Sequence, residues 1–145
     1  MRLTLMKKRV LFLCTANSCR SQMAEGIANH FLGVRLEAFS AGTAASYVNP
    51  RAIEVLREMG IDISGHRSKS LDEFAGQNFD FVITLCGDAN EKCPLHFGGV
   101  RRTHMGFPDP ARAMGTETEV LEEFRKVRDE IKGAIVAFFD REISE

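Results

Sequence analysis

The chain has 145 residues, 44% of them apolar and 27% charged, and its formal net charge is −1. This balance suits a globular protein with a real core and excludes a disordered chain. A charge so near zero gives no field that attracts nucleic acid or an anionic membrane, so an anion site must be built locally. No apolar run approaches the roughly 18 residues of a membrane span, and the run at 10–14 is too short for the apolar region of a signal peptide. We therefore expect a cytoplasmic protein with no nucleic-acid or membrane partner.

Four cysteines are the most informative part of the composition. An even number could form two disulfides in a secreted protein, but a chain of this size seldom needs them. In a reducing compartment such cysteines are expected to be catalytic, metal-binding or buried. They are Cys14, Cys19, Cys86 and Cys93.

Four short segments are predicted to be strands. The third, FDFVITL, is the strongest because it is rich in β-branched and aromatic residues, whereas the fourth, RRTHM, is weak. The segments are 10–13, 36–40, 79–85 and 101–105.

Helical patterns lie between and after these strands. Apolar residues recur every four positions after Ser21, at Met23, Ile27 and Phe31, and Gly33 is placed to end that helix. Asn49 and Pro50 form a cap and first turn of a second helix, for which Gly60 is the expected stop.

Two capping boxes predict further helices. SLDE at 70–73 precedes a short one, and TETE at 116–119 opens the last one. The last helix has a single apolar stripe, made of Val120, Phe124, Val127, Ile131, Ala134 and Phe138.

Strands that alternate with helices predict an α/β fold, a four-stranded parallel sheet with helices on both faces. The chain shows no repeat and no convincing linker. We therefore expect a single domain over 1–145, with residues 1–8 as a flexible N-terminal extension.

The segment CTANSCRS, residues 14–21, connects the first predicted strand to the first predicted helix. Ligands of parallel sheets bind beyond the carboxyl ends of the strands, so this segment lies where a site is expected. The amides of residues 15–20 could form a nest for a tetrahedral oxyanion at the helix N-terminus. The predicted substrate-binding residues are Thr15, Ala16, Asn17, Ser18, Cys19 and Arg20, and Arg20 adds a planar fork for two anion oxygens.

Cys14 is expected at the bottom of this nest as the nucleophile. The helix N-terminus and the Arg20 cation favour a thiolate there. Ser21 can donate its hydroxyl to the sulfur, and Asn17 tolerates the unusual backbone angles of such a loop. Cys19 is expected to serve packing.

These residues resemble the low-molecular-weight protein tyrosine phosphatase superfamily, whose signature is a Cys-x5-Arg-Ser loop after the first strand. The closer resemblance is to its thioredoxin-coupled arsenate reductases. It rests on NSCRSQMAEG, SAG, NP, IDIS, VITLCGDANEKCP, GFPDPAR and FRKVRDEI, and it covers nearly all of the chain after Lys8. Ala16 stands where that branch commonly has glycine, so a positive φ at this position would be strained.

The resemblance implies arsenate as the substrate, with phosphate or sulfate as competing oxyanions. It assigns Asp109, in DPAR, as the acid that protonates a departing oxygen. It also implies a relay in which Cys14 attacks arsenic, Cys86 then attacks Cys14, and Cys93 finally forms a disulfide with Cys86. Thioredoxin would reduce that disulfide, and no bound cofactor or metal is expected.

Several alternatives stay open. A tyrosine phosphatase would use the same Cys14, Arg20 and Asp109. A non-catalytic anion-binding or redox-switch module would use the disulfide as a switch. A glutaredoxin or a small thiol could replace thioredoxin. Cys86, Cys93 and His96 could bind zinc, although their spacing fits poorly.

One departure from the resembled branch concerns potassium. Some of its members hold a monovalent cation behind the loop with residues that match Asn17, Glu25 and Ser40 plus an acidic side chain. Here the position of that acid is Lys69. We expect its ammonium to take the place of the cation and to pair with Glu25.

Overall fold

The computed structural model describes residues 7–86 and 101–143. All four predicted strands are present, although the third begins at Phe81 rather than Phe79. The predicted extension over 1–8 stays a prediction, because most of it lies outside the described residues. The elements are β1 (Lys8–Cys14), α1 (Arg20–Leu32), β2 (Leu36–Gly42), α2 (Pro50–Arg57), the 3-10 helix η1 (Leu71–Phe74), β3 (Phe81–Thr84), β4 (Arg101–His104), the 3-10 helix η2 (Pro110–Arg112) and α4 (Glu117–Glu142).

The four strands form one parallel sheet in the order β2-β1-β3-β4. Cys14 at the end of β1 lies beside Gly42, and Thr84 at the end of β3 lies between Leu13 and His104. The carboxyl ends of all four strands therefore share one edge of the sheet. Segments that are remote in sequence meet there, as parallel α/β sheets require.

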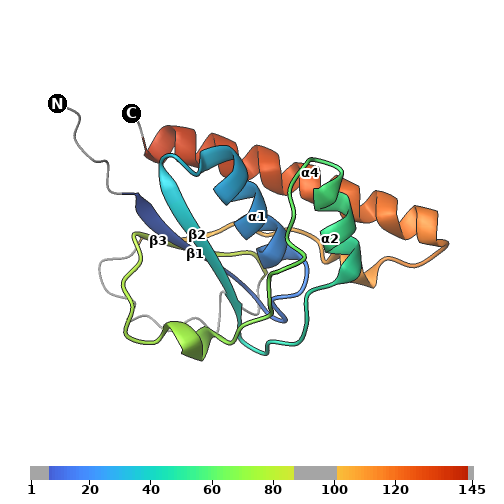
Figure 1. Ribbon diagram of the computed structural model, residues 1–145, viewed down its shortest axis with the longest axis horizontal. Coiled ribbons are helices and arrows are strands. Elements are labelled where there is room, and N and C mark those ends of the chain that lie inside the picture. Colours follow the sequence, from blue (N-terminus) through green and yellow to red (C-terminus); the bar gives the residue numbers. More distant parts are fainter. Residues whose placement is uncertain (1–6, 87–100, 144–145) are drawn as a thin grey trace.

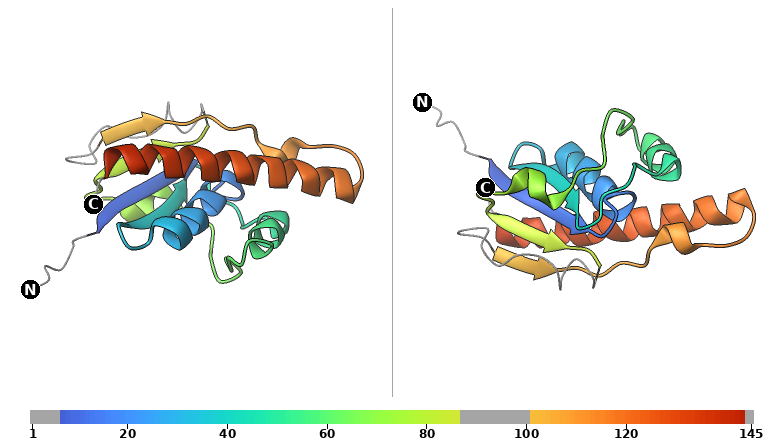
Figure 2. Two further views of the ribbon diagram at one scale, coloured as in Figure 1. Left: turned by 90° about the horizontal axis from the view of Figure 1, so that it is seen from above. Right: turned by 90° about the horizontal axis from the view of Figure 1, so that it is seen from below.

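Helices cover the sheet from both sides, as predicted. Figures 1 and 2 show α1 and α4 packed together on one face, with α2 beside them. Within the described residues, the other face carries η1, a 3-10 helix. Its Phe74 packs edge-on against Phe39 of β2 and against Phe79, with ring centroids 5.9 and 5.7 Å apart. No helix in this part of the chain is long and apolar enough to cross a membrane.

The predicted helix starts are largely confirmed. Asn49 caps α2 by accepting from the Arg51 amide, and Thr116 forms a complete capping box with Glu119. Ser70 accepts from the Asp72 amide, but the helix it opens is a single 3-10 turn. The segment 71–74 therefore contacts the sheet face over a single turn, and the chain then continues to β3.

Two residues of the predicted apolar stripes lie elsewhere. Phe31 occupies the last turn of α1 and is 41% exposed, where the Lys132 ammonium lies 4.5 Å from its ring centroid. On α4 the buried residue is Ile135 rather than Ala134, and Phe139 is buried as well. The buried arc of α4 is thus wider than one narrow stripe, because the helix packs against α1 and also against Phe81 of β3.

Gly42 ends β2 directly against the segment that follows β1. A Cβ atom there would lie 2.5 Å from the Thr15 carbonyl oxygen and 2.9 Å from the Asn17 amide nitrogen. We expect Gly42→Ala to displace this backbone and to lower the free energy of unfolding by about 1–3 kcal/mol, measured by urea denaturation. Gly65→Ala is the matched control, because a Cβ there meets nothing within 4 Å. Equal stability of the two variants would contradict this account of Gly42.

Candidate active site

Residues 14–20, which we call the Cys14 loop, connect β1 to α1 with every backbone carbonyl from 14 to 19 held from outside. Five of these carbonyls accept from backbone amides, four of them in the segment 43–49 and one in the first turn of α1, and the sixth accepts from the Gln22 side chain. Each donor lies 2.8 to 3.3 Å from its carbonyl oxygen. In order along the loop, the donors are Thr43 N, Ala44 N, Ser46 N, Gln22 Nε2, Asn49 N and Met23 N.

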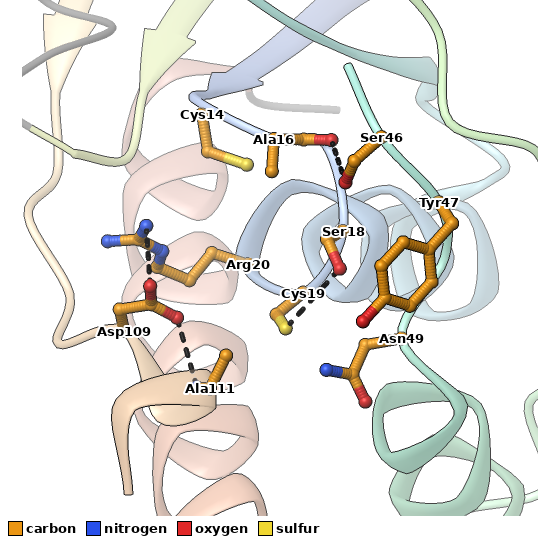
Figure 3. A pocket seen from close by; sticks show the side chains of 10 residues that line it. All are labelled: Cys14, Ala16, Ser18, Cys19, Arg20, Ser46, Tyr47, Asn49, Asp109 and Ala111. Atoms are coloured by element: carbon orange, nitrogen blue, oxygen red, sulfur yellow. Dashed lines mark hydrogen bonds and ion pairs between the residues drawn. The ribbon is translucent and has the colours of Figure 1, made fainter. Parts of the chain in front are cut away.

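This anchoring decides where the loop amides point. In a trans peptide the C=O and the following N–H point in opposite directions. The six carbonyls held from outside therefore leave the amides of residues 15–20 directed toward the inner side of the loop, which is the arrangement that the predicted nest requires. The Cys14 loop borders a cavity of about 200 Å³, seen in Figure 3, which is lined by Cys14, Ala16, Ser18, Cys19, Arg20, Ser46, Tyr47, Asn49, Asp109 and Ala111. Inward amides at a helix N-terminus favour an anion in such a cavity.

Asn17 takes the unusual backbone conformation that the loop needs. Its φ is +49°, and among the described residues it is the only non-glycine with a positive φ. Ala16 therefore avoids the strain that its methyl group would otherwise cause. The Asn17 side chain is fully buried and is held by the Lys69 amide, which donates to Oδ1 at 2.8 Å.

Cys14 lies at the base of the cavity with its sulfur held by Ser21. The Sγ and the Ser21 Oγ are 2.9 Å apart, and the Asn17 Nδ2 donates to that same oxygen at 2.7 Å. Because one lone pair of the hydroxyl already accepts from Asn17, its hydrogen is free to point at the sulfur. The predicted contact between Ser21 and Cys14 is confirmed, and Cys14 is only 2% exposed.

Arg20 and Asp109 lie together at the side of the cavity (Figure 3). The Arg20 Nη1 donates to the Phe107 carbonyl at 3.2 Å, and its Nη2 lies 3.7 Å from the Asp109 Oδ2. Asp109 is itself positioned as the cap of η2, through its Oδ1 and the Ala111 amide at 3.0 Å. A carboxyl group and a guanidinium thus face the same space as Cys14, and their catalytic roles remain predictions.

The second cysteine of the loop is a neutral thiol. Burial of Cys19 raises its pKa to about 12, although the hydrogen bond to Ser18 opposes this shift. Cys19 is 4% exposed and lines the cavity without being ionised at neutral pH. The expectation that it serves packing agrees with this environment.

Cys86 lies next to the Cys14 loop. The Leu85 amide donates to the Leu13 carbonyl at 2.8 Å, which aligns the end of β3 with the start of the loop. The Cys86 sulfur is then 3.2 Å from the Oγ1 of Thr15, the residue after Cys14. Cys93 and His96 lie outside the described residues, so the predicted relay and the zinc alternative are both untested there. Among the residues that are described, no group of three His, Cys, Asp or Glu side chains could hold a metal ion.

Glu25 lies behind the loop and gathers three partners. The Ser40 hydroxyl donates to its Oε1 at 2.5 Å, and the Lys69 Nζ lies 3.7 Å from the same oxygen. The His66 Nε2 is 3.9 Å from Oε2. The expected proximity of Lys69 and Glu25 is therefore present, with both side chains 14% exposed.

Sequence reasoning missed three residues of the site and its support, Gln22, His66 and Tyr47. Gln22 is fully buried and joins the loop to the segment around residue 67, and the His66 Nδ1 donates to its Oε1. Gln22 could have been noticed as a polar residue among the apolar residues of α1, a stretch that the sequence analysis used only for its hydrophobic spacing. Tyr47, 63% exposed at the cavity, was also missed.

Comparisons with known proteins agree with this geometry. The family model of low molecular weight phosphotyrosine protein phosphatase matches residues 9–145. An arsenate reductase of Bacillus subtilis (strain 168) is 50% identical over 131 residues, which are 90% of this chain and 94% of that protein. A solved arsenate reductase in the phosphate binding state has a TM-score of 0.80 at 35% identity, covering 94% of this chain and 98% of that one.

A solved low molecular weight protein tyrosine phosphatase from T. tengcongensis is similar as well. Its TM-score is 0.74 at 34% identity, with 93% of this chain and 99% of that chain covered. Both activities therefore occur on this fold at comparable identity among solved structures. The chain belongs to the low molecular weight phosphotyrosine protein phosphatase family, and its relatives within that family include the arsenate reductases.

Proposed function

We propose that this chain is an enzyme that reduces arsenate to arsenite with thiols. The observation that carries the proposal is a second thiol directly beside the Cys14 loop, since the Cys86 sulfur lies 3.2 Å from the Oγ1 of Thr15, the residue after Cys14. Two relatives that are named arsenate reductases, 50% and 51% identical in sequence to this chain, support it. Phosphate-ester hydrolysis has no use for that thiol, whereas arsenate reduction requires it.

In the first step the Cys14 thiolate attacks arsenic(V) held by the loop amides and Arg20. A sulfur–arsenic bond forms, and one arsenate oxygen leaves as water. Asp109, next to Arg20 at the side of the cavity, supplies the proton for that oxygen. The Ser21 hydroxyl stabilises the attacking sulfur before the bond forms.

In the second step the Cys86 thiolate attacks the Cys14 sulfur. A disulfide forms, the sulfur–arsenic bond breaks, and its electron pair stays on arsenic, which leaves as arsenite. Two thiols have thereby lost two electrons to arsenic(V). Cys86 is 9% exposed, beyond the last residue of β3, so it attacks from the sheet edge that also carries the loop.

In the third step Cys93 attacks Cys86 and frees Cys14. The resulting Cys86–Cys93 disulfide is the form that an external dithiol must reduce. We propose a thioredoxin for this role and the cytoplasm as the compartment, because a thiol relay needs reducing surroundings. No bound cofactor takes part, and phosphate and sulfate compete for the loop.

We expect steady NADPH consumption when arsenate is added to the protein with thioredoxin and thioredoxin reductase. Hydrolysis of p-nitrophenyl phosphate by the same sample should be slower by at least about tenfold, because one cavity and one acid serve both reactions but only the reduction uses Cys86. A sample that hydrolyses the ester rapidly and consumes no NADPH would identify a phosphatase instead. A sample without either activity would favour the non-catalytic module.

The cysteine variants separate the steps of the relay. We expect Cys93→Ser to release about one equivalent of arsenite and then stop with a Cys14–Cys86 disulfide, since the third step is lost. Cys86→Ser should release none. Arsenite release is quantified by chromatography, and the disulfides by mass spectrometry of peptides. Multiple turnovers by either variant would show that the relay assignment is wrong.

The contacts of Lys69 behind the Cys14 loop concern whether the enzyme needs a potassium ion. The Lys69 backbone amide holds Asn17, while its ammonium lies at the Glu25 carboxylate and donates to the Arg67 carbonyl at 3.1 Å. A tethered ammonium thus stands beside the carboxylate that a monovalent cation would otherwise neutralise. We propose that the enzyme is independent of potassium for this reason.

We expect the melting temperature and the turnover of the natural chain to be equal in potassium and sodium salts of the same concentration. Lys69→Met should lower the free energy of unfolding by about 1–3 kcal/mol, because it leaves a mostly buried carboxylate without its cation. Lys69→Asp should make the melting temperature rise with potassium but not with sodium. A marked potassium effect on the natural chain would overturn this assignment.

A further inference from the structure

A continuous chain of hydrogen bonds, part-buried at His66 and buried from Gln22 onward, connects His66 to the Cys14 sulfur. From the imidazole it runs through Gln22, Asn17 and Ser21, with links of 2.9, 2.9, 2.7 and 2.9 Å. Gln22, Asn17 and Ser21 are all fully buried. The chain thus connects a side chain at the partly exposed back of the loop to the nucleophile at its front.

The direction of the central links follows from an unambiguous donor. The Lys69 backbone N–H donates to one atom of the Asn17 amide, which must therefore be the oxygen. The other atom is then the Nδ2, and it can only donate to the Ser21 hydroxyl. That hydroxyl keeps its own hydrogen for the Cys14 sulfur.

Gln22 is oriented in the same way. One end of its amide faces three oxygens, the Asn17 Oδ1, the Asn17 carbonyl and the Arg67 carbonyl, at 2.9, 3.2 and 3.0 Å. Only a nitrogen donor is compatible with three acceptors, so the other end is the Oε1. The His66 Nδ1 lies 2.9 Å from that oxygen and must carry a hydrogen.

We propose that His66 and Gln22 are positioning residues for Cys14, whose aligned donors hold the Ser21 hydrogen on the sulfur. Each donor polarises the next one, so the last hydrogen bond is stronger than an isolated Ser–Cys contact would be. This inference deepens the proposed function, because the sulfur it concerns is the one that attacks arsenate.

The chain depends on the hydrogen that the His66 Nδ1 carries. Nδ1 carries a hydrogen in the required neutral tautomer and also in the cation. The charged groups around the ring are Glu25, whose Oε2 lies 3.9 Å from Nε2, the Lys69 ammonium on the same carboxylate, and Asp62, whose pKa is lowered chiefly by hydrogen bonds from Ser64 and slightly by His66. The chain therefore needs a donor at the Nδ1 position, rather than a charge.

Two substitutions at His66 separate these requirements. Asn places its amide nitrogen where the Nδ1 stands and so keeps the donor, whereas Leu removes it at similar volume. With a side chain 25% exposed, His66 tolerates both changes better than buried Gln22 would. His30→Leu is the matched control, because His30 is exposed and its ring contacts Phe31 far from the loop.

The readout is the rate of Cys14 alkylation by iodoacetamide across pH, quantified by fragment-ion mass spectrometry of the peptide that contains Cys14 and Cys19. Cys19 does not interfere, because its pKa of about 12 keeps it a thiol. We expect His66→Leu to slow alkylation at about pH 7 by threefold to tenfold and to move the midpoint of the profile to higher pH. His66→Asn and His30→Leu should stay within about twofold of the natural chain.

Two outcomes would overturn the proposal. In one, His66→Leu alkylates as fast as the natural chain. In the other, His66→Asn is as slow as His66→Leu, which would mean that the ring packs rather than donates. Melting temperatures of each variant identify a folding defect, and Gln22→Met then provides the second test with the same expected slowing. Since alkylation needs no arsenate, its result is independent of whether the chain proves to be a reductase.

Discussion

The fixed orientation of the Cys14 loop depends on hydrogen bonds to its carbonyl oxygens from outside. Six successive carbonyls accept hydrogen bonds from the segment 43–49, from the Gln22 side chain and from the Met23 amide of α1. The amides between these carbonyls therefore point toward the inner side of the loop. A bare row of amides in solution would instead turn toward water. Inward amides favour an anion, so the anion preference that we propose for this site follows from how the rest of the fold satisfies the loop's acceptors.

The same anchoring explains why the site uses so little charge. The chain as a whole is nearly neutral, and the cavity has one guanidinium, which is itself shared with Asp109 and the Phe107 carbonyl. Where water does not compete, backbone amide dipoles can stabilise an anion that would otherwise need several surface lysines. Burial raises the pKa of Cys19, the second sulfur in the same loop, to about 12, so Cys14 is the one nucleophile of the loop in the reaction that we propose.

Behind the loop, two polar assemblies share residues. Glu25 collects Ser40, Lys69 and His66, while Asn17 collects Lys69, Gln22 and Ser21. Lys69 belongs to both, and His66 contacts Glu25 directly and is linked to Asn17 through Gln22. Buried polar groups of this kind are costly unless every member finds partners, and here the members do.

Local sequence patterns were enough to predict several features of this protein. These are the strands, the helix caps at Asn49 and Thr116, and the Cys-x5-Arg-Ser loop between a strand and a helix. These features depend on neighbours within a few residues, where periodicity, capping chemistry and motif spacing act. Asp109 was placed by resemblance, and the structure puts it beside Arg20 at the cavity.

Only the tertiary structure decided the rest. That Ile135 rather than Ala134 is buried depends on the neighbours of α4, and that η1 is a single 3-10 turn depends on the space over the sheet. His66 meets Gln22 across 44 positions of sequence, and Cys86 meets Thr15 across 71. No local pattern encodes such meetings, because they arise when parallel strands bring their carboxyl ends to one edge and buried polar groups must then find partners among whatever lies there.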